Sequence, residues 1–234
     1  MPTRNRMDLT EELVALVERI EPDPGPLPGI ADPTEDDYLN TAATLLAQHR
    51  PAPLWLFAYG SLIWKPEVEH LSHVPATAHG WHRRFCMQIT RWRGTLEVPG
   101  LMMQLDRGGS CAGVAYRLPD EDHHGQIVRL LRRELDGNPA TNVPRWIEVA
   151  SPDGPVTALT FVAAPGGPRY AGRLPLQEVA RTLARAAGHW GSTAAYLYNT
   201  VLKLEEHGIR DRNLWALQAM VAEEIRRLRF AAAA

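Results

Sequence analysis

The chain has 234 residues, a formal net charge of −2 at pH 7 and two cysteines, Cys86 and Cys111. A charge so close to balance gives no electrostatic case for a nucleic-acid partner, and two cysteines make no disulfide framework. No segment approaches the roughly 18 consecutive apolar residues of a membrane span. We therefore expect a cytoplasmic protein that uses neither a membrane nor a nucleic acid.

The first fifty residues predict two helices with a proline-rich segment between them. Apolar residues at helical spacing indicate a helix over 7–20, and the prolines of 21–26 end it because proline lacks the backbone N–H. A second helix is predicted over 34–48, with acidic residues in its first turn. We expect residues 1–50 to form a helical extension and residues 51–230 to form the main domain.

The main domain has strands first and helices last. Its predicted strands are 54–58, 74–90, 101–105, 111–118, 143–149 and 156–163. Its predicted helices are 120–135, 175–187, 192–207 and 211–229. This grouping favours an α+β fold, in which a mixed, mostly antiparallel sheet or barrel is flanked by helices.

The first predicted strand ends in an unusual turn. Residues 54–58 carry no polar side chain, which is typical of a strand that is covered on both faces. The turn that follows reads Tyr59-Gly60-Ser61-Leu62. Glycine allows the backbone to turn and to approach a ligand closely, and the two hydroxyls add polar groups beside the main-chain amides. Such a turn can hold a small anion or zwitterion, or it can simply connect a buried strand to the next element.

A carboxylate lies on the apolar face of the helix predicted over 120–135. Ile127, Leu130 and Leu131 form that face, and Glu134 returns to it seven residues after Ile127. Burial raises the pKa of a carboxylate toward neutrality, which suits a general acid or base. The alternatives are that Glu134 pairs with Arg145 or Arg84, or that it faces solvent at a frayed helix end.

Other candidate residues carry weaker signals. His70, His73, His79 and His82 lie close together in the sequence, but no cysteine or carboxylate completes a recognisable metal-ligand set. Ser61 does not lie in a Gly-x-Ser-x-Gly elbow. Cys86 stands between apolar neighbours, as a core cysteine does. Arginine clusters such as 82–84 and 91–93 are short, and we interpret them as solvated strand edges or ion-pair partners.

Several short segments occur in a characteristic order along the chain. They are Phe57–Trp64, Gly80–Cys86, Arg93–Thr95, Pro99–Gly100, Gly113–Leu118, Leu131–Glu134, Tyr170, Ala195–Leu197, Lys203–Leu204 and Gly208. Together they resemble the motifs of the ChaC family of γ-glutamylcyclotransferases, over about residues 54–225. There are two departures: Ala58 stands where many members have glycine, and residues 136–144 replace a loop that often contains glycine and tyrosine.

The resemblance implies a fold, a reaction and a set of site residues. The expected fold is that of the γ-glutamylcyclotransferases, and the expected reaction is cyclisation of the γ-glutamyl group of glutathione to 5-oxoproline with release of cysteinylglycine. Glu134 would be catalytic, and Tyr59, Gly60, Ser61, Leu62 and Tyr170 would bind the substrate. No cofactor or metal is expected, because nucleophile and electrophile belong to one molecule.

Three alternatives stay open at this point. The enzyme could act on other γ-glutamyl amino acids or amines, because the divergent loop 136–144 borders the expected leaving-group side. The chain could instead be a non-catalytic regulator that binds γ-glutamyl compounds. An amidase with Ser61 as nucleophile would release free glutamate. The sequence does not indicate an oligomeric state.

Overall fold

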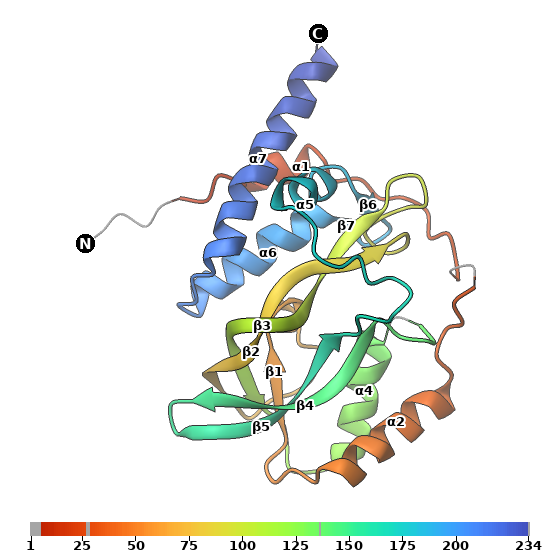
Figure 1. The fold of residues 1–234 in the computed structure, drawn as a ribbon, viewed down its shortest axis with the longest axis vertical. Coiled ribbons are helices and arrows are strands. Elements are labelled where there is room, and N and C mark those ends of the chain that lie inside the picture. Colours follow the sequence, from red (N-terminus) through yellow and green to blue (C-terminus); the bar gives the residue numbers. More distant parts are fainter. Residues whose placement is uncertain (1–5, 27–28, 136, 234) are drawn as a thin grey trace. The chain divides into compact units, whose positions relative to one another are not determined.

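The computed structural model describes residues 6–26, 29–135 and 137–233, which fall into two compact units (Figure 1). The barrel unit comprises residues 26–87 and 103–170, and the helical unit comprises residues 1–25, 88–102 and 171–234. Among the described residues, no helix combines the length and the apolar character needed to cross a bilayer.

Five strands close into a barrel with the order β1-β3-β2-β4-β5 (Figure 1). They are β1 (Trp55–Ala58), β2 (Ser72–Ile89), β3 (Gly100–Arg117), β4 (Asn142–Ser151) and β5 (Gly154–Ala163). β1 is antiparallel to β3 and parallel to β5, and β4 and β5 form an antiparallel hairpin. The predicted α+β fold with a mixed barrel is confirmed.

β3 changes direction along its length. Its C-terminal part is antiparallel to β1, whereas Leu105 is paired in parallel with Val162 of β5. Because β1 and β5 run parallel, β3 must turn between these two pairings. Gly108 and Gly109 lie there with φ of +103° and +71°, a region that glycine adopts without steric cost. The prediction of two separate strands in this segment is wrong: one strand bends at two glycines.

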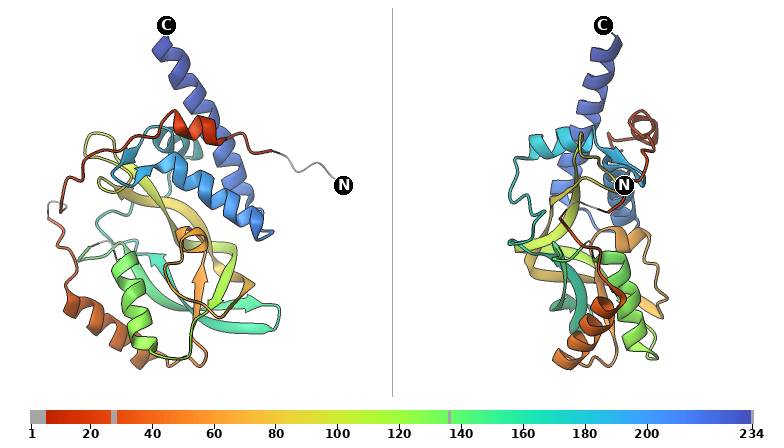
Figure 2. Two further views of the ribbon diagram at one scale, coloured as in Figure 1. Left: turned by 180° about the vertical axis from the view of Figure 1, so that it is seen from behind. Right: turned by 90° about the vertical axis from the view of Figure 1, so that its right-hand side faces the viewer.

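The barrel unit carries three helices: α2 (Glu35–Gln48), the single turn α3 (Ser61–Trp64) and α4 (His123–Glu134). α2 and α4 pack against each other (Figures 1 and 2). α2 begins where it was predicted, because Thr34 and Asp37 form a reciprocal capping box. α4 begins three residues later than predicted, at a cap formed by the side chain of Asp122.

The helical unit consists of α1 (Glu11–Ala15), α5 (Leu176–Leu183), α6 (Thr193–Glu206), α7 (Arg212–Ala233) and the two-residue strands β6 (Ala187–Gly188) and β7 (Gly191–Ser192). α1, α5 and α6 each contact the long helix α7 (Figure 2). Their shared core includes the buried α7 residues Leu214, Leu217, Val221, Ala222 and Ile225.

The N-terminal helix is shorter than predicted. α1 ends at Ala15, and Ile20 of the predicted helix 7–20 is 82% exposed. The residue that anchors this segment lies before the helix: Leu9 is fully buried, and its N–H donates to Gln218 Oε1 over 2.7 Å. Helices are thus present in the N-terminal region, while its division from the main domain at residue 50 stays a prediction.

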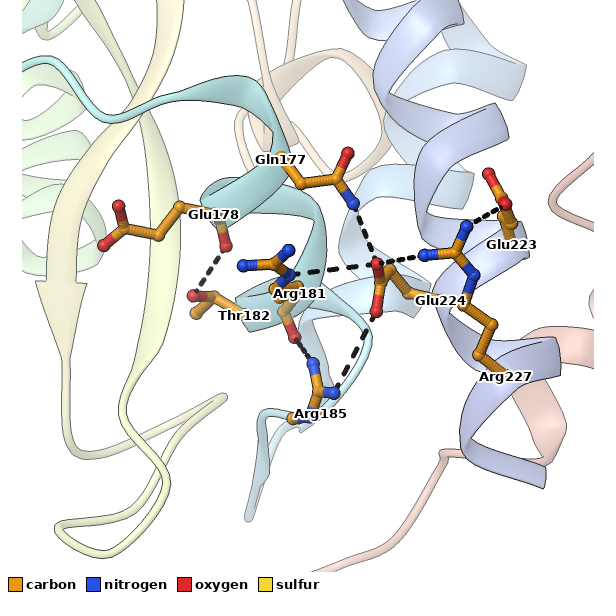
Figure 3. A network of polar contacts seen from close by, with 8 residues as sticks. All are labelled: Gln177, Glu178, Arg181, Thr182, Arg185, Glu223, Glu224 and Arg227. Atoms are coloured by element: carbon orange, nitrogen blue, oxygen red, sulfur yellow. Dashed lines mark hydrogen bonds and ion pairs between the residues drawn. The ribbon is translucent and has the colours of Figure 1, made fainter. Parts of the chain in front are cut away.

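A buried carboxylate connects α5 to α7 (Figure 3). The side chain of Glu224 is only 6% exposed and accepts a hydrogen bond from Gln177 Nε2 over 2.8 Å. Three arginines surround it: Arg227 at 3.5 Å, Arg185 at 3.9 Å and Arg181 at 4.0 Å. A buried carboxylate needs such partners, because removing it from water without them is costly.

Replacing Glu224 with alanine is expected to lower the free energy of unfolding by about 1–3 kcal/mol, because Gln177 and the three arginines lose the buried acceptor that connects α5 to α7. Glu223→Ala is a matched control on the same helix, since its side chain is 60% exposed and contacts only Arg227 among the residues drawn in Figure 3. This control should change stability by at most about 0.5 kcal/mol. Urea unfolding of both variants measures the difference, and equal effects would contradict the assigned role of Glu224.

Candidate active site

The chain leaves the barrel at the C-terminal end of β1. Leu56, Phe57 and Ala58 are fully buried, as the absence of polar side chains predicted. Tyr59 and Gly60 form a bend, and the helical turn α3 starts immediately at Ser61. The first N–H groups of a helical turn have no partner within that turn, so they are available to acceptor groups.

Buried hydrogen bonds fix the position of this strand end. Arg83 on β2 is 7% exposed, and its Nε donates to the carbonyl oxygen of Tyr59 over 2.6 Å. The same guanidinium also donates to the carbonyl oxygen of Ala112 on β3. On the other side, Thr160 Oγ1 donates to the carbonyl oxygen of Phe57 over 2.9 Å. Side chains from two strands, Arg83 of β2 and Thr160 of β5, therefore hold the backbone before Gly60.

Arg83 is a site residue that the sequence interpretation missed, because the cluster 82–84 was assigned to solvated strand edges. The alternation of side chains along β2 could have indicated its burial. Trp81, Arg83 and Phe85 share one face of the strand, and all three are buried. A charged residue between two aromatic residues on the inward face of a strand indicates a buried, paired arginine.

Glu134 is the last residue of α4 and turns toward the protein interior. The inward residues Ile127, Leu130 and Leu131 are fully buried, and the carboxylate of Glu134 is only 15% exposed. Its Oε1 accepts from Arg133 Nε over 2.9 Å. Arg133 in turn lies 3.2 Å from Glu67 Oε2.

Neither of the ion pairs considered for Glu134 is formed. Arg84 pairs with Asp106 instead, and Arg145 is exposed on β4, opposite Thr160 of β5. The third alternative, a carboxylate in solvent at a frayed helix end, is also wrong, given the small exposed fraction of Glu134.

Burial raises the pKa of Glu134 above the usual range of a glutamate. The Arg133 guanidinium and the hydrogen bonds from Arg133 and Asn142 oppose this rise, and the negative charge of Glu67 adds to it. Because burial has the largest effect, the net shift is upward, and the carboxylate becomes a stronger base than a free glutamate. This is the behaviour expected of a group that exchanges protons near neutral pH.

Asn142, the first residue of β4, holds the end of α4. Its Nδ2 donates to both the backbone oxygen of Glu134, over 3.1 Å, and the carboxylate oxygen Oε2, over 3.3 Å. Sequence reasoning missed Asn142, because only the fold brings the start of β4 to the end of α4. Asn142 belongs to the divergent loop 136–144, of which residue 136 lies outside the described residues.

Strand register relates Asn142 to the end of β1. Asn142 pairs with Ala163 at the C-terminal end of β5, and Leu56 of β1 pairs in parallel with Leu159. In this parallel register Ala58, the last residue of β1, lies level with Phe161, two residues before Ala163. The turn 59–62 and the group that holds Glu134 thus lie at the same end of the barrel. The Glu134 carboxylate accepts hydrogen bonds from Arg133 and Asn142, not from residues of that turn.

Tyr170 belongs to the same unit and is partly exposed. Its backbone forms an isolated bridge with Met87 of β2, and its hydroxyl donates to Asp106 Oδ2 over 3.0 Å. The neighbouring residue Arg169 donates its N–H to Thr141 Oγ1, directly before Asn142 in the chain. The residue before Tyr170 is therefore hydrogen-bonded to the segment that holds Glu134.

The remaining candidates do not assemble into a second site. His70 and His73 lie against Tyr116, and no group of three or more His, Cys, Asp or Glu residues in the described part of the chain has metal-binding geometry. Cys86 is fully buried, and burial raises the pKa of its thiol to about 12. A thiol of this kind stays protonated at neutral pH, as expected of a core cysteine.

Comparisons with known proteins identify the family to which the chain is similar. A family model described as ChaC-like protein matches residues 54–224. The glutathione-specific gamma-glutamylcyclotransferase of Escherichia coli K12 is 37% identical over 181 residues, covering 77% of this chain and 78% of the relative. The mouse glutathione-specific gamma-glutamylcyclotransferase 1 is 34% identical over 150 residues, covering 63% of this chain and 67% of the relative.

The fold is also that of a solved structure. A crystal structure of the yeast gamma-glutamyl cyclotransferase specific to glutathione superposes with a TM-score of 0.65 at 23% sequence identity. The match covers 74% of this chain and 97% of the yeast chain. At this identity the likeness concerns the fold, which is the mixed barrel with its flanking helices.

Proposed function

Because the chain belongs to the ChaC-like proteins, we propose that it is a glutathione-specific γ-glutamylcyclotransferase, a lyase that releases 5-oxoproline and cysteinylglycine. The observation that carries the proposal is Glu134, a largely buried carboxylate with a raised pKa at the end of the barrel where β1 opens into the turn 59–62. A protein that only binds γ-glutamyl compounds has no need of a buried base.

The reaction is an intramolecular acyl transfer. The α-nitrogen of the γ-glutamyl group attacks its own γ-carbonyl carbon, a C–N bond closes the five-membered ring, and the bond to the cysteinyl nitrogen breaks. The α-nitrogen loses two protons in total, because it changes from an ammonium group to the ring amide N–H. The departing nitrogen gains the same number when it leaves as the ammonium group of cysteinylglycine, so no water is consumed. Holding the substrate in a folded conformation lowers the barrier, because both reacting atoms are then already in place.

Each site residue has a role in this proposal. Glu134 takes a proton from the α-nitrogen and delivers a proton to the leaving nitrogen. The amides and hydroxyls of Tyr59, Gly60, Ser61 and Leu62 bind the glutamyl end, and the amides can stabilise the developing oxyanion. Tyr170 also contacts the bound substrate. The reaction needs no cofactor, and we place it in the cytoplasm, where glutathione keeps thiols reduced.

Incubation of the purified protein with glutathione tests the proposal. The expected products are 5-oxoproline and cysteinylglycine in equal amounts, measured by mass spectrometry. Free glutamate together with an acyl-enzyme on Ser61 would favour an amidase. Binding of glutathione by calorimetry without any product would favour a regulatory protein.

A parallel assay with γ-glutamylalanine tests the choice of substrate. The divergent loop 136–144 motivates this comparison, because it includes Asn142 beside Glu134. Glutathione is expected to give the higher kcat/KM. The opposite order would assign the protein to other γ-glutamyl compounds while leaving the chemistry unchanged.

Asn142→Ala is expected to lower kcat/KM about tenfold, the effect of losing one hydrogen bond to a charged group. Because the Asn142 hydrogen bond lowers the pKa of Glu134, its removal raises that pKa further. The acid limb of the pH profile should therefore move to higher pH. Asn40→Ala, at an exposed position of α2, is the matched control and should keep the wild-type profile. An unchanged acid limb in Asn142→Ala would contradict the role given to this amide.

A further inference from the structure

The hydroxyl of Tyr170 contacts a buried carboxylate, Asp106, which has no role in the reaction described so far. Asp106 follows Leu105 on β3, and its side chain is 5% exposed. Oδ2 accepts from Arg84 Nη1 over 2.6 Å and from the Tyr170 hydroxyl over 3.0 Å, while Oδ1 accepts from the N–H of Arg107 over 2.8 Å. Both carboxylate oxygens are thus used, and Arg84 supplies the opposite charge that a buried carboxylate needs.

This arrangement fixes the direction of the Tyr170 hydrogen bond. An ionised carboxylate can only accept hydrogen bonds, and a phenol has a single hydrogen to donate. The hydrogen of Tyr170 is therefore committed to Asp106, and the phenolic oxygen is left to act as an acceptor. The backbone bridge between Tyr170 and Met87 fixes the main chain of Tyr170 beside β2.

We propose that Asp106 is a positioning residue of the cyclotransferase, which orients the Tyr170 oxygen to accept an N–H of the substrate's α-ammonium group. The inference rests on the proposed function and deepens it. An ammonium group carries three N–H donors, so one can be held by Tyr170 while another is transferred to Glu134. Asp106 touches no reacting atom and acts only through Tyr170.

A double-mutant cycle on Asp106→Asn and Tyr170→Phe tests this inference. Asp106→Asn keeps the shape of the side chain but removes the charge that fixes the hydroxyl. Each single variant is expected to raise KM for glutathione roughly tenfold with a much smaller change in kcat, because a hydrogen bond to a charged group is lost in ground and transition states alike. The double variant should show the same tenfold increase rather than a hundredfold one.

The control is Asp120→Asn, which removes an exposed carboxylate from its ion pair with Arg117 in the same unit. Its KM should stay at the wild-type value. Multiplicative effects in the double variant, or a wild-type KM in Asp106→Asn, would overturn the positioning role. Thermal unfolding accompanies each assay, so that a folding defect is recognised.

A second measurement does not depend on turnover. Burial raises the pKa of the Tyr170 phenol, and the hydrogen bond and negative charge of Asp106 raise it further; Cys86 adds to the effect and Arg84 opposes it. ¹³C labelling of the six tyrosine rings allows the titration of Tyr170 to be followed by NMR. In Asp106→Asn its pKa should fall toward the usual value, and an unchanged pKa would overturn the proposed contact.

The kinetic assays and the NMR titration distinguish a failure of the proposed function from a failure of the role given to Asp106. A wild-type protein that releases no 5-oxoproline overturns the proposed function, and with it the substrate-positioning role, even if the NMR titration shifts as expected. An active wild-type protein whose Asp106→Asn variant keeps the wild-type KM overturns the role of Asp106 alone.

Discussion

Glu134→Gln is expected to reduce 5-oxoproline release from glutathione by about 10²- to 10⁴-fold, the range over which positioned acid–base groups accelerate proton transfer. Glutamine keeps the size and the hydrogen-bonding shape of the side chain but cannot take a proton from the α-ammonium. Product formation followed by mass spectrometry measures the loss. Glutathione binding, measured by calorimetry on the same variant, should be largely kept.

A matched control is available on the neighbouring helix. Glu35 of α2 pairs with Arg132 of α4, much as Glu134 pairs with Arg133, but its side chain is 55% exposed. Glu35→Gln is expected to turn over glutathione at the wild-type rate. Near-normal turnover of glutathione by Glu134→Gln, or an equal loss of turnover in both variants, would contradict the assignment of Glu134 as the base.

The raised pKa of Glu134 also predicts how stability and activity depend on pH. A carboxyl group whose pKa is higher in the folded than in the unfolded state binds more protons when the protein is folded. As the pH rises from the unfolded-state pKa to the folded-state pKa, the free energy of unfolding therefore decreases. Glu134→Gln should therefore be more stable than the wild type at neutral pH. The difference in stability should vanish at pH values below the range in which an unperturbed glutamate titrates. Activity should be lost on the acid side at a higher pH than a free glutamate would predict.

The elements that sequence alone predicted correctly are those whose signals are local. Thr34 and Asp37 cap α2 by a contact within four residues, and the spacing of Ile127, Leu130 and Leu131 places Glu134 on the inner face of α4. The prediction of a helix over 7–20 was wrong because a local pattern does not show whether a packing partner is present. Its apolar spacing continues to Ile20, but no packing partner covers Ile20, which is 82% exposed.

Features that depend on the folded barrel could not be predicted in the same way. Asn142 contacts Glu134 only because β4 begins beside the end of α4, and Asp106 meets Tyr170 across 64 residues of chain. The glycines 108–109 look like a break between strands, and only the pairing of β3 with both β1 and β5 shows that they carry a bend. The resemblance proposed Glu134 as the catalytic residue, whereas the contacts of its carboxylate with Arg133 and Asn142 are seen only in the folded chain.

Gly113→Ala is expected to have the second large effect, because it acts on the backbone that leads into the turn 59–62. Gly113 precedes Val114, which is paired with Ala58 at the end of β1. A Cβ atom at Gly113 would lie 2.8 Å from two ring carbons of Phe57 and closer still to the carbonyl oxygen of Ala58. A backbone oxygen cannot move aside as a flexible side chain can, so β1 and β3 must separate.

This separation should affect both stability and catalysis. Overpacking of this kind costs about 1–3 kcal/mol of the free energy of unfolding. It also displaces the strand end that Arg83 holds through the carbonyl oxygens of Tyr59 and Ala112. A displacement of about 1 Å at groups that position a substrate can lower the rate by about 10²-fold. We therefore expect kcat/KM to fall by that order even at temperatures where the variant is fully folded.

Gly166→Ala provides the control, since no atom lies within 4 Å of a Cβ at that exposed position and its φ is not positive. It should change the free energy of unfolding by at most about 0.5 kcal/mol and leave turnover unaffected. Urea unfolding and glutathione turnover, measured on both variants, separate a general loss of stability from a local displacement of β1. If Gly113→Ala loses stability but keeps full turnover when folded, then the end of β1 does not position the substrate, and the turn 59–62 is a connection rather than a binding site.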